Sequence, residues 1–266
     1  MNADRRNVLG IMVSPVDYQG AVNLILQAAR EKRGIAVSAL AVHGLMTGVL
    51  SREQKYRLNH FDLLLPDGQP VRWALNWLYH SGLSDRVYGP NLTIWVCARA
   101  EADGLPVFFY GSTAEILAAL ERSLIRKFPQ LKIAGMEASK FRRLASEEET
   151  ELAERLKTSG ARILFVGLGC PRQEIFAYEL RDAIGIPIVA VGAAFPFIGG
   201  TMPQAPQWLQ QNGLEWLYRL LSEPGRLWRR YVFLNPAYLV LLALQIFGLA
   251  SFATEGRSPT SAERYG

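Results

Sequence analysis

The amino-acid sequence predicts an α/β fold, in which a Rossmann-like, largely parallel sheet carries helices on both faces. The chain has 266 residues, of which 50% are hydrophobic and 20% are charged, so it can bury a full core. Short apolar runs of strand length alternate with helical patterns, and this repeated order is typical of parallel sheets. The predicted strands are residues 8–13, 35–40, 61–65, 107–110, 163–166 and 186–191.

Two of the intervening helices have clear sequence signals. Apolar residues recur at every fourth position between residues 116 and 128, which places them on one helical face. Ser146 and Glu149 have the spacing of a capping box, so a second helix is predicted to begin there and to end at Gly160.

The composition changes after Pro206, which divides the chain into three predicted parts. Residues 1–205 are expected to form the α/β catalytic core, and residues 206–252 a C-terminal helical, membrane-associating appendage. Residues 253–266 are small, polar and charged, so they are predicted to be a disordered tail.

The appendage has the pattern of a basic amphipathic helix followed by an apolar segment. Arg226, Arg229 and Arg230 share one helical face, with Trp228 and Tyr231 beside them, and such a helix lies in the membrane interface. A solvated charged face is the alternative, but the apolar residues 237–252 make exposure to water costly. This stretch is short against the roughly 20 residues of a span, so interfacial or shallow insertion is expected.

Few residues in the sequence are suited to metal binding or to disulfide formation. Cys97 and Cys170 are far apart, and the three histidines are scattered, so neither a metal site nor a disulfide framework is predicted. No secretory signal is visible at the start, and we expect the protein to reside on the cytoplasmic side of the plasma membrane. The net charge of +5 is modest and does not by itself establish an anionic partner, and no nucleic-acid partner is expected.

A candidate catalytic base stands directly after the predicted strand at residues 61–65. Ligands of parallel sheets bind beyond the carboxyl ends of the strands, and Asp67 would lie there, with Gly68 allowing close approach of a ligand. A carboxylate can take a proton near neutral pH when burial raises its pKa. An Asp-Gly turn without chemistry is the alternative interpretation.

A glycine-rich loop follows the predicted strand at residues 163–166. Gly167 and Gly169 would let backbone amides meet a phosphate at a helix N-terminus, and Pro171, Gln173 and Glu174 complete the loop. Gln173 is suited to hydrogen bonding with a sugar or phosphate, although both side chains could simply cap the helix.

The remaining candidate binding residues follow other strands. Gly111 and Ser112 would bind phosphate or cap the next helix, and His43 would line the same edge of the sheet. Gly192 follows residues 186–191, but no acidic residue stands there to hold a ribose. This absence, with the missing third glycine after Gly169, disfavours a nucleotide-cofactor oxidoreductase, which stays the alternative.

These stretches together resemble the WecG/TagA/CpsF family, glycosyltransferase family 26, from about residue 8 to residue 247. The matching segments are 62–68, 86–89 with Leu92, 166–174, 213–220, Glu223-Pro224 and 226–231. The resemblance implies an inverting, metal-independent hexosyl or N-acetylhexosaminyl transferase without a cofactor. Its donor would be a UDP-sugar and its acceptor an undecaprenyl-diphosphate-linked sugar, in exopolysaccharide, teichoic acid or common antigen synthesis.

Carried over by position, the resemblance implies that Asp67 is the base and that Gln173 positions a substrate. It also brings arginines of the appendage to the pocket and to the inner face of the membrane. The residues expected to contact the lipid diphosphate or the membrane are Arg219, Arg226, Trp228, Arg229, Arg230 and Tyr231. A homo-oligomer is compatible with the sequence.

Three positions depart from the usual residues of the family. Ala41 stands where Asn is usual, Pro196 where Asp is usual, and Gln204 where Arg is usual. All three are expected near the donor sugar, so they bear on its identity. They also keep open a third interpretation, a membrane-bound scaffold of the same fold with weakened catalysis.

Overall fold

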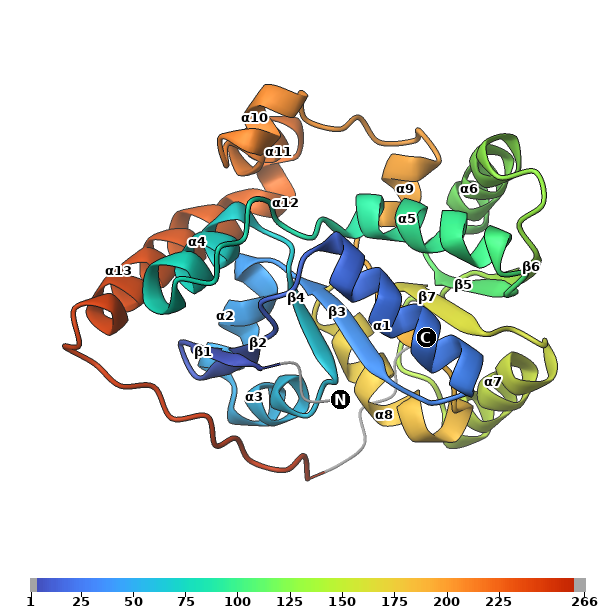
Figure 1. Ribbon diagram of the computed structural model, residues 1–266, viewed down its shortest axis with the longest axis horizontal. Coiled ribbons are helices and arrows are strands. Elements are labelled where there is room, and N and C mark those ends of the chain that lie inside the picture. Colours follow the sequence, from blue (N-terminus) through green and yellow to red (C-terminus); the bar gives the residue numbers. More distant parts are fainter. Residues whose placement is uncertain (1–3, 261–266) are drawn as a thin grey trace.

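A computed structural model describes residues 4–260, apart from the side chains of Arg226, Arg229 and Arg230. Its centre is a parallel six-stranded sheet in the order β4-β3-β8-β7-β5-β6 (Figure 1). The α/β class predicted from the sequence is therefore confirmed. The strands are β3 (Ala36–Leu40), β4 (Leu63–Pro66), β5 (Val107–Gly111), β6 (Ile133–Glu137), β7 (Ile163–Gly167) and β8 (Ile188–Ala190).

Helices cover both faces of the sheet, because alternate side chains of each strand point to opposite sides. Val37, Phe109 and Phe165 pack with the helices of one face, whereas Ala36, Tyr110 and Val166 pack with those of the other. The first face carries α1 (Tyr18–Glu31), α5 (Gly89–Ala102), α6 (Ala114–Lys127) and α9 (Ala194–Ile198). The second carries α2 (Val42–Leu50), α3 (Arg52–Asn59), α7 (Ser146–Thr158) and α8 (Arg172–Ile184).

Two predicted elements differ from the structure near the chain start and before α7. The apolar run at residues 8–13 forms an antiparallel hairpin, β1 (Arg6–Val8) and β2 (Ile11–Val13), because Leu9 and Gly10 take positive φ angles and reverse the chain. Helix α7 is capped one residue earlier than expected, since the Glu148 side chain accepts from the Ala145 backbone N–H at 2.9 Å.

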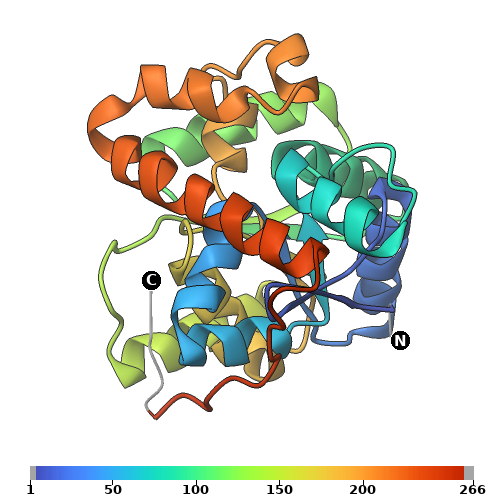
Figure 2. The same ribbon diagram turned by 90° about the vertical axis from the view of Figure 1, so that its left-hand side faces the viewer.

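The appendage consists of short helices that lie against the core beside α4 (Gln69–Tyr79) (Figure 2). They are α10 (Gln207–Gln211), α11 (Glu215–Ser222), α12 (Pro224–Arg229), the π-helical turn η1 (Arg230–Leu234) and α13 (Asn235–Ile246). Tyr238 and Leu242 of α13 are buried, and the Tyr238 hydroxyl donates to the Pro70 carbonyl at 2.9 Å. Within residues 4–260, no helix combines the length and apolar character needed to cross a membrane.

The chain beyond α13 returns along the hairpin and α3. The Asn7 side chain donates to the Phe252 carbonyl at 2.8 Å, the Asn59 side chain donates to the Thr254 carbonyl at 2.7 Å, and the Arg257 N–H donates to the Arg52 carbonyl at 2.9 Å. Thr254 and Arg257 of the predicted tail therefore contact the core, and disorder of the tail stays a prediction. Residues 261–266 of the predicted tail lie outside the described part of the chain.

Candidate active site

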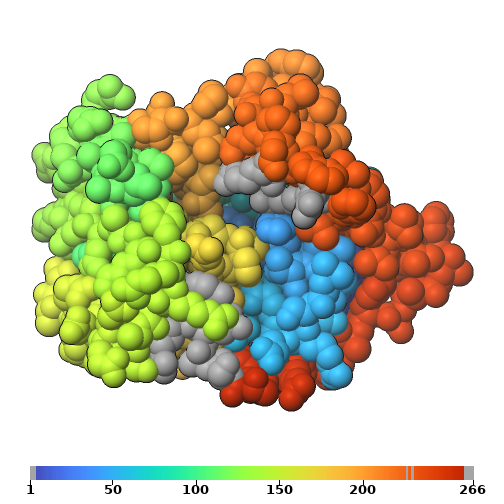
Figure 3. All heavy atoms as spheres, turned by 180° about the vertical axis from the view of Figure 1, so that it is seen from behind, coloured from blue at the N-terminus to red at the C-terminus, as the bar shows by residue number. Residues whose placement is uncertain are grey.

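Two pockets adjoin at the carboxyl ends of the strands. The strand-loop pocket, of about 1280 Å³, is lined by the loops after β3, β5, β7 and β8. The appendage pocket, of about 660 Å³, lies between α2, the start of α4 and the appendage. The surface is hollowed where the appendage meets α2 and the loop after β7 (Figure 3). Ala41, Asp67, Tyr88 and Arg219 line both pockets, so these four residues form their common wall.

Asp67 follows β4 directly, and its backbone N–H donates to the Leu40 carbonyl at the end of the neighbouring strand β3. Burial raises the pKa of its carboxyl group to about 7. The positive charges of Arg86 and Arg219 and a hydrogen bond from the Gly89 N–H oppose this rise, whereas the charge of Glu215 adds to it. A carboxylate with this pKa can both hold and release a proton near neutral pH.

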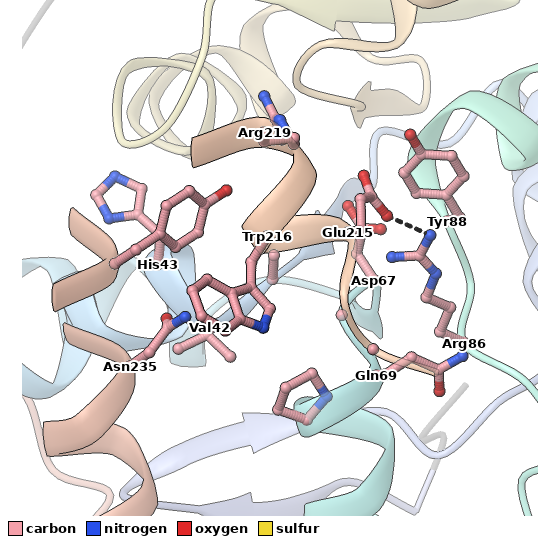
Figure 4. A pocket seen from close by; sticks show the side chains of 15 residues that line it. Val42, His43, Asp67, Gln69, Arg86, Tyr88, Glu215, Trp216, Arg219 and Asn235 are labelled. Carbon is pink, nitrogen blue, oxygen red and sulfur yellow. Dashed lines mark hydrogen bonds and ion pairs between the residues drawn. The ribbon is translucent and has the colours of Figure 1, made fainter. Parts of the chain in front are cut away.

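A buried ion pair joins the core to the appendage next to Asp67 (Figure 4). The Arg86 guanidinium lies 2.5 Å from the Glu215 carboxylate and donates to the Gln210 side chain at 3.1 Å. It also lies over the Tyr88 ring, 4.2 Å from the ring centroid. Only about a tenth of either charged side chain is exposed. Breaking such a pair is costly, so this contact holds α10 and α11 over the site.

Arg219 of α11 is an appendage cation that lines both pockets. Its guanidinium lies 5.6 Å from the centroid of the Phe197 ring. Its Nε is buried and has no hydrogen-bond partner within residues 4–260. A buried guanidinium nitrogen without a partner is expensive, so this side chain is suited to an anionic ligand in the common wall.

Gln173 and Glu174 form a buried hydrogen-bonded group at the start of α8. The Gln173 amide donates to Glu174 at 2.8 Å and accepts from the Gly192 N–H at 3.0 Å, which ties α8 to the loop after β8. Ser38 of β3 donates to Glu174 at 2.9 Å. Burial raises the pKa of Glu174, and these hydrogen bonds partly oppose the rise. Both side chains line the strand-loop pocket, and Gln173 is already engaged in shaping it.

Four of the predicted loop residues line the strand-loop pocket, whereas Gly111 has a role in the packing of the sheet. Ser112, Gly167, Gly169 and Gly192 line the pocket. Gly111 is the last residue of β5 and pairs with Gly167 of β7. Its φ is +117°, and a Cβ there would lie 2.8 Å from the Gly167 carbonyl oxygen. The geometry of Gly111 is thus explained by strand packing.

The other predicted site residues occupy different places. His43, Gly68 and Tyr231 line the appendage pocket, together with Trp216 and Asn235. Pro171 and Trp228 are exposed and line neither pocket. The helix α12 and the turn η1 contain the positions of Arg226, Arg229 and Arg230, whose side chains lie outside the description.

Several site residues were not assigned a role from the sequence. Arg86 and Glu215 are 129 positions apart, so their pairing has no local sequence signal, although both lie in segments that resemble the family. Phe141 is 57% exposed and lines the strand-loop pocket, where its ring is available for stacking. The loop before it has no motif that would have identified it.

The three residues that differ from the usual residues of the family line different pockets. Ala41 is in the common wall, Pro196 lines only the strand-loop pocket, and Gln204 lines a third pocket between the core and α10. Within residues 4–260, no group of three or more His, Cys, Asp or Glu side chains is arranged to hold a metal ion.

The comparison with protein families agrees with this geometry. Residues 6–251 match the family model described as the glycosyl transferase WecG/TagA/CpsF family, which is nearly the whole chain. The match includes the strands, the loops that line both pockets and the appendage helices. It also overturns the oxidoreductase alternative, because the family is one of glycosyl transferases. The chain therefore belongs to the WecG/TagA/CpsF family of glycosyltransferases.

Proposed function

We propose that the protein is an inverting hexosyl or N-acetylhexosaminyl transferase of cell-surface polysaccharide synthesis. It moves a sugar from a UDP-sugar to a polyprenyl-diphosphate-linked sugar. The observation that carries the proposal is the position of Asp67 in the wall common to two pockets, with a carboxyl pKa of about 7. The donor would occupy the strand-loop pocket and the reacting hydroxyl of the acceptor would enter the appendage pocket, so the reacting atoms would meet at this carboxylate.

The proposed reaction is a single displacement. An acceptor hydroxyl oxygen attacks the anomeric carbon of the donor sugar from the face opposite the UDP, the bond to the diphosphate oxygen breaks, and UDP leaves with the electron pair. Asp67 takes the hydroxyl proton as the new glycosidic bond forms. Attack from the opposite face inverts the anomeric configuration.

The negative charge that develops on the leaving diphosphate needs stabilisation. Arg219 offers a guanidinium whose Nε has no partner within residues 4–260, and the loops around Gly169 and Gly192 offer backbone amides. These groups support our proposal of a metal-independent reaction without a cofactor. The exposed ring of Phe141 is suited to stacking on the uracil base at the outer end of the same pocket.

The appendage supports a peripheral location at the inner face of the plasma membrane. Large apolar side chains of the appendage are exposed to solvent, among them Leu221, Phe233, Val240, Phe247 and Leu249, each at least 59% exposed. Exposed apolar surface of this kind is typical of a membrane or protein contact. A lipid-linked acceptor would enter the appendage pocket from this side.

The test is a turnover assay with the full-length protein in detergent or vesicles. A panel of UDP-sugars is incubated with undecaprenyl-diphosphate-linked N-acetylglucosamine, released UDP is measured, and the linkage of the product is determined by NMR. We expect acceptor-dependent UDP release and an inverted anomeric centre. A retained configuration would refute the proposed displacement, whereas intact donor binding without turnover on any acceptor would favour the scaffold interpretation.

A further inference from the structure

A third pocket lies on the other side of Arg86 from Asp67, at the seam between the core and α10. It is open to solvent and has a volume of about 870 Å³. Gln69, Arg86 and Tyr88 line both this pocket and the appendage pocket, so the two adjoin. Asp67 does not line it. We call it the amide pocket, because five of its lining residues are glutamines and a sixth is Asn91.

Three of the five glutamines of the amide pocket are exposed, so water rather than protein meets their hydrogen-bonding groups and a ligand can reach them. Within residues 4–260, the side chains of Gln204, Gln207 and Gln211 make no hydrogen bond, in contrast to Gln210, which bridges Arg86 and the Ala205 carbonyl. The side-chain oxygen of Gln69, a residue only 6% exposed, is also without a partner. Each carboxamide offers both donors and an acceptor. A ligand that donates and accepts at several points would satisfy them.

The charges around the amide pocket argue against an anionic ligand. Arg86 is neutralised by Glu215 at 2.5 Å, and among the side chains that the structure describes the only other charged one in the lining is that of Asp85. The Asp85 carboxylate accepts from the Arg86 N–H at 2.7 Å and from the Gln69 side chain at 3.3 Å. A phosphate would therefore meet a carboxylate without an available cation. An aliphatic ligand would leave the amides without partners, which is costly.

We propose that the amide pocket binds a neutral sugar ring. Hydroxyl groups donate and accept at once, as carboxamides and a carboxylate require, and they carry no charge. The proposal rests on the proposed function in one respect: the sugar ring would be part of the glycan at the acceptor end of the reaction. Two sources share this chemistry, namely the sugar of the lipid-linked acceptor itself and a separate saccharide such as a released glycan.

The first arm of the test measures direct binding and requires no turnover. The probe is N-acetylglucosamine, titrated into the full-length protein by saturation-transfer difference NMR, with N-acetylglucosamine 6-phosphate as the anionic comparison. The variant is Gln207→Ala with Gln211→Ala, which changes two exposed side chains of α10. The matched control is Gln27→Ala with Gln130→Ala, two exposed glutamines that line none of the three pockets.

We expect the pocket variant to bind the neutral sugar about thirtyfold more weakly, since two hydrogen bonds of about 1 kcal/mol each are lost. The control should bind like the wild type, and the phosphorylated sugar should bind more weakly than the neutral one. Equal affinity of the pocket variant and the control for N-acetylglucosamine would overturn the proposal. So would a preference for the phosphorylated sugar that disappears in the pocket variant.

The second arm distinguishes the sources through turnover on the lipid-linked acceptor. If the bound ring belongs to the acceptor, the pocket variant should raise the acceptor KM about thirtyfold while kcat stays close to the wild-type value. If the ring is a separate saccharide, KM should be unchanged while binding of free N-acetylglucosamine is lost. Absence of turnover in the wild type would refute the proposed function, yet the binding arm would still decide whether the amide pocket binds sugars.

Discussion

At the scale of single residues, the carboxyl group of Asp67 has the environment that a base needs. It lies at the end of a buried strand, and burial raises its pKa to about 7 against the opposing charges of Arg86 and Arg219. The balance of these effects leaves the carboxylate available at neutral pH but still able to accept a proton. Glu215 is part of that balance, although it is contributed by the appendage.

This environment predicts the pH dependence of turnover. A base must be deprotonated to act, so kcat/KM should rise with pH through an apparent pKa of about 7. Glu215→Gln removes a negative charge that raises the pKa of Asp67, so in this variant kcat/KM should rise at lower pH than in the wild type. The check is a pH–rate profile of both proteins. If the rise of kcat/KM in Glu215→Gln stays at the same pH or moves to higher pH, then the Glu215 charge does not raise the pKa of Asp67.

The same pKa predicts that Asp67 costs stability at alkaline pH. Its folded pKa is raised above the unfolded value near 4, so its favourable contribution is present below pH 4 and is lost as pH rises through about 7. Asp67→Asn should therefore be more stable than the wild type at pH 8, by about 4 kcal/mol, with little difference near pH 4. The Tm of Asp67→Asn and of the wild type at pH 4 and at pH 8 tests this. A variant whose Tm lies below that of the wild type by the same amount at both pH values would contradict the prediction.

The sequence identified Asp67 because its signal is local: an aspartate that follows a strand-length apolar run and precedes a glycine. It did not assign roles to Arg86 and Glu215, because their ion pair depends on how the appendage folds back over the core. Gln173 lies at the start of the helix after β7, where the sequence predicted it, but its hydrogen bond with the Gly192 N–H is a tertiary contact that no local pattern contains.

At the scale of secondary-structure elements, the loop between β7 and α8 is held in place by buried hydrogen bonds. Gln173→Ala would leave the Gly192 N–H and part of the Glu174 carboxyl without a partner, so it should cost about 1–3 kcal/mol of stability. We expect turnover to fall about tenfold or more as the pocket loosens, with the protein still folded. Calorimetry and steady-state kinetics check both effects. A folded variant with normal kcat and KM would show that Gln173 is only structural.

The basic helix of the appendage is the element expected to contact anionic lipid. Replacing Arg226, Arg229 and Arg230 by Ala should weaken binding to phosphatidylglycerol vesicles, since each arginine near an anionic surface contributes about 1 kcal/mol. Flotation at low and high salt measures this, and the matched control replaces Arg122, Arg126 and Lys127 of α6 by Ala. Equal flotation of the two triple variants would mean that the basic helix is a solvated face.

Elements with strong sequence signals were predicted well, and the failures have physical reasons. The buried strands β5 and β7 are unbroken apolar runs and β3 is apolar except for Ser38, so their positions follow from the sequence. Strand β6 was missed because it is a half-buried edge strand that contains Gly135 and Glu137. The hairpin at residues 6–13 was read as one strand, since the reversal at Leu9 and Gly10 lies within an apolar run.

At the scale of the whole molecule, the site is assembled from two parts of the chain. The core contributes the strand-loop pocket and Asp67, and the appendage contributes Arg219, Glu215 and the outer wall of the second pocket. The Arg86–Glu215 pair, the Tyr238–Pro70 hydrogen bond and the C-terminal segment on α3 fix the appendage against the core. In the proposed reaction, donor and acceptor therefore meet where the two parts join, at Asp67.

The most direct test of this claim is the turnover rate of Asp67→Asn with a UDP-sugar and an undecaprenyl-diphosphate-linked sugar, measured beside UDP affinity in the same preparation. Because the substitution removes the base but keeps the side-chain shape, turnover should fall by roughly 10² to 10⁴ while UDP binds as tightly as to the wild type. A folded Asp67→Asn protein that binds UDP normally and turns over at nearly the wild-type rate would contradict the account.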